Sequence, residues 1–245
     1  MPDVAAPAQI TFKTLLAPGV AAVRRYWKPF LLLQGSAFLL VVGYYTSAPI
    51  RSLCDHLSEF KQHGGLIFTA IAAAFAGGLM PEFAKALVLG DRAITRQRIR
   101  NVAFVLVTYA LSGMMTDLFY RGMGWLFGTD TRFPTVLRKV LFDQLLYTPV
   151  YGTPYWVVVY LLRANRYNLI TTAAQLSPGW YLERVVPLLI PSWVFWTPMV
   201  LLVYSLPGPL QFCMFCFASA AWSLVMVFVA TQEAAAERSR MENRE

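Results

Sequence analysis

Five ionisable side chains lie within long apolar stretches, where a charge is costly unless it is paired or touches water. They are Glu82, Lys85, Asp117, Arg121 and Asp143. Gln144 follows Asp143 directly and adds an amide to the carboxylate. Inside a membrane segment, such groups face other helices or a wet cavity. Two roles follow from this: these groups line a path for small polar solutes, or they hold helices together.

Spacing predicts which of these groups are neighbours. Residues three or four apart share one face of a helix. Glu82 with Lys85, and Asp117 with Arg121, are therefore expected to neutralise each other locally. The cation of such a pair would extend toward water while its apolar stem stays in the membrane.

The carboxylates of Asp117 and Asp143 fall at similar outer depth on consecutive antiparallel segments. Arg121 and Lys139 are expected near enough to bridge them. We predict one polar cluster of Asp117, Arg121, Lys139, Asp143 and Gln144 that lines an outward-facing vestibule. A purely structural ion-pair network accounts for the same residues equally well.

The elements that must position these groups are long apolar segments. Of 245 residues, 57% are hydrophobic and 14% charged, against about 45–50% and about 25% in a typical soluble domain. Six segments come near or exceed the roughly 20 residues that span a bilayer core. They are 30–48, 64–89, 102–127, 140–162, 185–206 and 209–231. The sequence predicts an all-α, multi-pass transmembrane bundle in one domain, 29–231, between a basic tail, 1–28, and a charged tail, 232–245.

The basic residues indicate an orientation. With six spans and the N-terminus inside, the inner segments carry fourteen Lys and Arg residues and the outer segments five. Cytoplasmic loops are richer in Lys and Arg, so both termini are expected on the inner, cytoplasmic side. The net charge of +8 then reflects topology and contact with anionic lipid headgroups in the bilayer, with no nucleic acid implied.

Further patterns concern packing. Small residues at 72–78 and 218–221 predict close helix contacts at the bundle centre. Prolines in the fourth and fifth segments, including Pro154, predict bends. The turn 205–208 predicts a helical hairpin of the last two segments. Tryptophans near the segment ends predict interfacial positions: Trp27, Trp125, Trp156 and Trp180.

Patterns typical of enzymes and metal sites are weak. Cys213 and Cys216 form a C-x-x-C in an apolar segment without a second pair, and His56 and His63 fall in the 49–63 connection. We predict no metal and no cofactor. The sequence has no Gly-rich phosphate loop, no Gly-x-Ser-x-Gly and no histidine within a segment, so we expect no enzyme activity.

Several motifs resemble the Mpv-seventeen and twenty-two-kilodalton peroxisomal membrane protein family. Lys139-Val-Leu-Phe-Asp143-Gln144 followed by Pro149 is similar to its lysine, Asp-Gln and proline signature. The segment 113–121 resembles its Gly-Pro…Trp-Tyr-basic motif. Weaker similarities are Pro81-Glu82, Trp193 to Pro198, Leu206-Pro207 and Trp222. The resemblance covers about residues 64–231, so 30–48 is expected to be an extra N-terminal span.

The chain departs from that family's pattern at several positions. Met114 replaces proline, Phe119 replaces tryptophan, and Asp117 stands where many members have histidine. Gln211 and Ser223 replace an arginine and an asparagine.

The resemblance implies a small membrane protein of possible pore function. It implies an inner (plasma) membrane in a bacterium, or a peroxisomal or inner mitochondrial membrane in a eukaryote. We therefore expect a passive channel for small solutes lined by Glu82, Asp117, Arg121, Asp143 and Gln144. The alternative is a non-conducting scaffold or membrane-homeostasis protein in which the same groups only lock the bundle. The sequence leaves homo-oligomer formation open.

Overall fold

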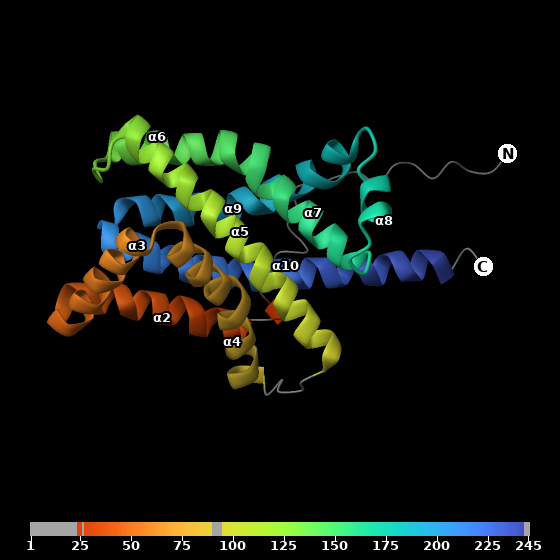
Figure 1. Cartoon of the computed structure of the whole chain (residues 1–245), viewed down its shortest axis with the longest axis horizontal. Helices are drawn as coiled ribbons and strands as arrows, with labels where there is room; N and C mark the ends of the chain where they lie inside the picture. Colours follow the sequence, from red (N-terminus) through yellow and green to blue (C-terminus); the bar gives the residue numbers. More distant parts are fainter. Residues whose placement is uncertain (1–23, 26, 90–94, 243–245) are drawn as a thin grey trace.

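The computed structural model describes residues 24, 25, 27–89 and 95–242, and the regular elements of this part of the chain are all helical (Figure 1). The predicted all-α class is confirmed. The elements are α2 (Trp27–Thr46), α3 (Ala48–Ala74), η1 (Phe75–Leu79), α4 (Met80–Leu89), α5 (Arg96–Phe127), α6 (Phe133–Phe142), η2 (Asp143–Gly152), α7 (Thr153–Ala164), α8 (Leu169–Ala174), η3 (Tyr181–Val185), α9 (Val186–Ser205) and α10 (Gly208–Glu242). Elements η1, η2 and η3 are π-helical.

Five helical stretches in the described residues are long and apolar enough to cross a membrane. They are Trp27–Thr46, Ala48–Ala84, Arg96–Phe127, Tyr181–Ser205 and Gly208–Val225. Large apolar side chains are exposed along them, such as Phe38, Ile67 and Leu111. Such a surface suits lipid better than water, so the apolar helices indicate an integral membrane protein. The predicted fourth span, 140–162, belongs to the continuous helical stretch from α6 through η2 to α7, which is not among the five.

Helix α10 forms the centre of the bundle and contacts α2, α3, η1, α4, α7 and α9. Its small residues Ala218, Ala220 and Ala221 are buried. On the facing π-helix η1, Gly77 lies directly beneath the Tyr109 ring of α5, where a Cβ atom would collide with that ring. The predicted close packing of small residues at the bundle centre is confirmed, because only such residues allow backbones to approach this closely.

The predicted outer connection, 49–63, is helical instead. It forms the first half of α3, which begins after Ser47 with Pro49 in its first turn, a position where proline is tolerated. The helix kinks at Gly65, whose φ of 54° and ψ of −137° favour glycine. Sequence reasoning missed this helix because its charged residues resemble a loop. Its helical form places Lys61 within the bundle.

The two prolines of the fourth segment lie five residues apart within and just after η2. In a π-helix each carbonyl accepts from the N–H five residues later. Proline has no N–H, so the carbonyls of Gln144 and Pro149 lose their donors, Pro149 and Pro154. Side chains of the next segment replace them: Trp193 Nε1 donates to Gln144 O at 2.7 Å, and Tyr181 Oη donates to Pro149 O at 2.8 Å. The prolines thus fix η2 against η3 and α9.

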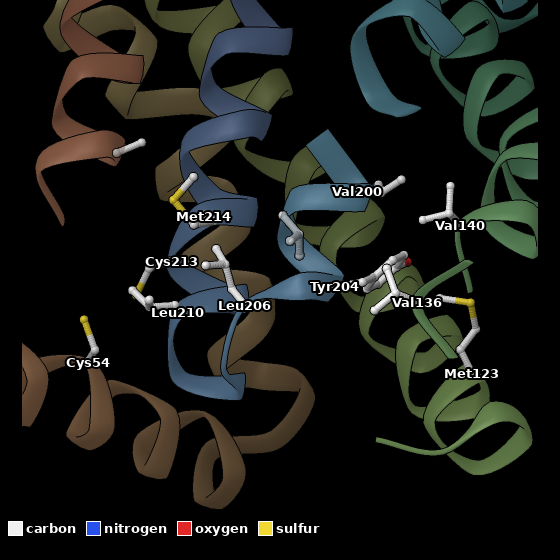
Figure 2. Packing of buried hydrophobic residues seen from close by; sticks show 12 residues of the cluster. Cys54, Met123, Val136, Val140, Val200, Tyr204, Leu206, Leu210, Cys213 and Met214 are labelled. Atoms are coloured by element: carbon white, nitrogen blue, oxygen red, sulfur yellow. The ribbon is translucent and has the colours of Figure 1, made fainter. Parts of the chain in front are cut away.

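A buried apolar cluster joins α9 to its neighbours. In Figure 2, Val200 and Tyr204 of α9 face Val136 and Val140 of α6 and Met123 of α5. On the other side, α10 packs against α3. Helices α9 and α10 meet at the turn after Ser205, so the predicted hairpin is confirmed.

Three of the connections define one end of the bundle, here called the hairpin end: α2 to α3, α5 to α6, and α9 to α10 (Figure 1). The start of α5 and the α7–α8 turn lie at the opposite end. Most of the predicted basic tail, 1–28, lies outside the described residues. The backbone of α10 stays helical through most of the predicted charged tail, to Glu242.

Candidate functional site

A cavity of about 700 Å³ lies at the hairpin end between α3, α5 and α10. It is here called the outer cavity; in the names of the cavities, outer and inner follow the sides that the sequence predicts for the two ends. Asp117 is its buried carboxylate. Lys61 Nζ lies 2.9 Å from Asp117 Oδ1, and Arg121 Nε lies 2.7 Å from Asp117 Oδ2. The predicted pairing of Asp117 with Arg121 is confirmed. With two cations on one carboxylate, this group of three residues carries a net positive charge. It favours anions in this part of the outer cavity, here called the mouth.

Lys61 was missed because the sequence assigned it to a loop. In the helical α3 it faces Asp117 across the α3–α5 contact, and its Nζ also lies 5.3 Å from the Phe212 ring centroid. The sequence holds one signal for a partner such as Lys61, and it is Asp117 itself. A carboxylate in a membrane segment with a single exposed arginine as its partner has room for a second cation.

A different carboxylate starts η2. Asp143 is buried, and its hydrogen-bond donors within the described residues are uncharged side chains. Tyr204 Oη donates to its Oδ2 at 2.5 Å, and Gln144 Nε2 donates to its Oδ1 at 3.0 Å. Thr148 Oγ1 lies 3.4 Å from the same Oδ1.

The single predicted cluster is therefore wrong: it divides into two hydrogen-bonded groups. Arg121 pairs with Asp117, and no ion pair joins Lys139 to Asp143 among the described residues. The buried Lys139 instead places Nζ 6.0 Å from the Tyr204 ring centroid. The prediction failed because a tyrosine on α9 takes the position expected for a cation.

Gln144 connects η2 to α9 through both its backbone and its side chain. Its carbonyl accepts from Trp193, and its Oε1 accepts from Thr197 Oγ1 at 3.3 Å. Its amide nitrogen donates to Asp143. The Asp143-Gln144 pair thus fixes one end of η2 to α9 from several directions.

Between the two groups lies an internal cavity of about 80 Å³, here called the chamber. It borders the outer cavity, since Gly113, Thr116, Tyr120 and Phe215 line both. Asp143 is the acidic residue of its wall. Aromatic rings supply much of the remaining wall, namely Tyr109, Tyr147, Trp156, Trp196 and Trp222.

A third cavity, of about 250 Å³, lies at the opposite end and is here called the inner cavity. Glu82 accepts from Arg98 there, with Nη2 and Nε at 2.6 and 2.9 Å from its Oε2. The sequence had assigned Arg98 to an inner connection and missed this pair across α4 and α5. The side chain of Lys85, predicted to pair with Glu82, lies outside the described part of the chain.

Three aromatic side chains, those of Tyr109, Trp156 and Trp222, line the chamber but not the inner cavity, and they are here called the aromatic wall. The ring centroids of Tyr109 and Trp156 are 4.4 Å apart, and Trp222 completes this wall from α10. Ser223, the next residue of α10, lines the inner cavity. Trp156 lines the chamber, whereas Trp27 and Trp125 are exposed. The interfacial positions expected for these tryptophans stay a prediction.

A further carboxylate at the hairpin end, that of the exposed Asp130, lies just before α6. Arg132 N donates to Asp130 Oδ1 at 3.0 Å, and Thr135 Oγ1 donates to Oδ2 at 3.2 Å. The backbone hydrogen bond from Arg132 lowers the pKa of the Asp130 carboxyl below its usual value. No group of three or more His, Cys, Asp or Glu side chains that could hold a metal ion occurs within the described residues.

No family model, curated protein or solved structure matches this chain. The resemblance to the Mpv-seventeen and twenty-two-kilodalton peroxisomal membrane protein family stays a prediction.

Proposed function

We propose that the chain is a six-span membrane protein that provides a passive route for small solutes, in a closed conformation. One observation carries the proposal. The outer cavity, the chamber and the inner cavity follow one another along the bundle, each with polar groups in its wall. A bundle that needed only to pack would gain stability by filling these spaces, because cavities are destabilising.

The gate in this proposal is the aromatic wall between the chamber and the inner cavity. Tyr109 and Trp156 are in ring contact there, and Tyr109 rests on the backbone at Gly77. Opening requires these rings to move. The π-helices η1 and η2 flank the wall and give it irregular backbone, which is a common feature of functional positions.

The test is solute flux into liposomes that contain the purified full chain. Swelling in glycerol, measured by stopped-flow light scattering, is expected to exceed that of protein-free liposomes. Tyr109→Ala should raise the rate several-fold by thinning the wall. Tyr44→Ala, a partly buried tyrosine of α2 outside all three cavity linings, should not. Well-folded protein that never exceeds protein-free liposomes in either form would contradict the proposal.

A scaffold role is the second candidate, because Asp143 has a specific structural use. Its carboxylate joins η2 to α9 through Tyr204, and all of its contacts are within the bundle. In a pure scaffold, Asp143→Asn would lower the melting temperature and no variant would alter flux. Flux that responds to Tyr109→Ala would exclude a role limited to packing.

A further inference from the structure

Three buried polar atoms on chamber-lining side chains have no hydrogen-bond partner within the described part of the chain. They are Tyr109 Oη, Thr153 Oγ1 and Trp222 Nε1. The side chains belong to α5, α7 and α10, and each residue is more than nine-tenths buried. The Ser223 hydroxyl lies close to Tyr109 Oη but does not reach hydrogen-bond geometry.

An unpaired buried polar atom is unfavourable by about 1–3 kcal/mol, so such atoms are rare in folded proteins. Three of them around one cavity indicate that the cavity receives a polar molecule. Two are hydroxyls, which donate and accept, and the third is an indole N–H, which only donates. Ser192 and Ser219 add hydroxyls to the same wall. The matching ligand presents several oxygen atoms able to accept and donate hydrogen bonds.

The charges around the chamber select against ions. Among its described lining residues none is Lys or Arg, so an anion would lack a counter-charge. The carboxylate of Asp143 is already engaged by Tyr204, Gln144 and Thr148, which take three of its roughly four lone-pair positions. A cation would find one position left and no second carboxylate in the described lining. The ligand that fits this wall is therefore neutral.

Size and wall composition narrow the ligand class further. A volume of about 80 Å³ gives room for about five water-sized groups, on the scale of one probe sphere per water. The faces of Trp156, Trp196 and Trp222 offer apolar contact to the C–H groups of a small carbon chain. A short carbon chain with a hydroxyl on every carbon meets both demands.

We propose that the chamber binds a small neutral polyol of about the size of glycerol, through Tyr109, Thr153 and Trp222. The proposal rests on the proposed route in one respect: the bound polyol is a solute in transit only if that route exists. The binding site itself is testable without flux.

The test is binding of glycerol to the full chain in lipid nanodiscs, followed by saturation-transfer NMR. A saturable signal with a dissociation constant on the order of millimolar is expected for so small a ligand. Trp222→Phe, Thr153→Val and Tyr109→Phe should each weaken binding about fivefold, for one hydrogen bond lost. Thr108→Val and Tyr160→Phe are matched controls outside the lining and should leave it unchanged.

Wild-type protein alone also tests the ligand class, should a variant fail to fold. Binding of 1-propanol, with the same carbon skeleton, should be undetectable, and tetramethylammonium should not compete with glycerol. An unsaturable glycerol signal, equal binding of 1-propanol, or competition by tetramethylammonium would overturn the polyol site. Saturable binding without liposome flux would uphold the site and overturn the passive route, whereas flux without saturable binding would do the reverse.

Discussion

Asp117 and Asp143 are both buried, but the protein compensates them in different ways. Asp117 lies between Lys61 and Arg121, whose side chains are 28% and 56% exposed in and around the outer cavity. Asp143 is held by Tyr204, Gln144 and Thr148, with no cation among its described partners. One carboxylate belongs to the outer cavity with two cations beside it, and the other to a joint between two helices in which its partners are uncharged.

The difference shows that burial alone does not tell what a membrane carboxylate does. The two cations beside Asp117 are partly exposed, so they can turn to water if the carboxylate is removed. Donors from a neighbouring helix make Asp143 part of the packing. The two groups should therefore respond differently to the same substitution.

The largest effect is expected from Asp143→Ala. It leaves the Tyr204 hydroxyl and the Gln144 amide buried without their acceptor. The free energy of unfolding should fall by about 3 kcal/mol. Asp117→Ala should lower the free energy of unfolding by only about 1 kcal/mol, because Lys61 and Arg121 can turn to water. Thermal unfolding of both variants in one detergent measures the difference. The comparison fails if Asp117→Ala proves the more destabilising.

The joint at η2 provides the next test. Trp193→Phe removes the donor to the buried Gln144 carbonyl and is expected to lower stability by about 2 kcal/mol. Pro149→Ala restores a backbone N–H five residues after Gln144, so the double variant should recover part of the loss. A double-mutant cycle measures this coupling. Strictly additive losses would mean that the proline and the tryptophan do not share that carbonyl.

Asp117→Asn probes the charged mouth with little change in shape. Lys61 and Arg121 keep their charges, so the local potential becomes more positive. Iodide should therefore quench tryptophan fluorescence about threefold more strongly than in the wild type, because the exposed Trp125 lines the outer cavity. Asp143→Asn serves as the matched control and should change this quenching less. An equal increase in both variants would place Asp143 at the mouth as well.

Asp130 is a third carboxylate, fully exposed, and should show the smallest effect. Its folded-state pKa is lowered, so its contribution to stability is present above the unfolded pKa near 4 and is lost as pH falls through the lower folded value. Asp130→Asn should therefore lower the melting temperature slightly at pH 7. The gap between variant and wild type should close near pH 3. A gap that widens on acidification would contradict the hydrogen bonds described for the Asp130 carboxylate.

Much of the fold follows from the sequence because apolar length and basic flanks are local signals. They predicted five of the helical stretches now seen as long and apolar, and the hairpin after Ser205. The polar groups were harder, because their partners come from distant elements. The spacing of Asp117 and Arg121 revealed one pair, yet Lys61, Arg98 and Tyr204 depend on how α3, α5 and α9 cross.

The chamber shows the same limit. Tyr109, Thr153 and Trp222 lie on three helices far apart in sequence, and nothing in their local pattern brings them together. By contrast, the five-residue spacing of Pro149 and Pro154 was visible in the sequence. Together with a π-helix, it would have predicted two carbonyls in need of donors.

Glycerol flux through the aromatic wall tests the central claim most directly. Liposomes with wild-type protein, Tyr109→Ala and the Tyr44→Ala control are compared at equal protein content by stopped-flow light scattering. A passive route through the chamber predicts that wild-type protein exceeds protein-free liposomes and that Tyr109→Ala is several-fold faster than both the wild type and the control. Rates equal to protein-free liposomes for all three folded proteins would contradict it.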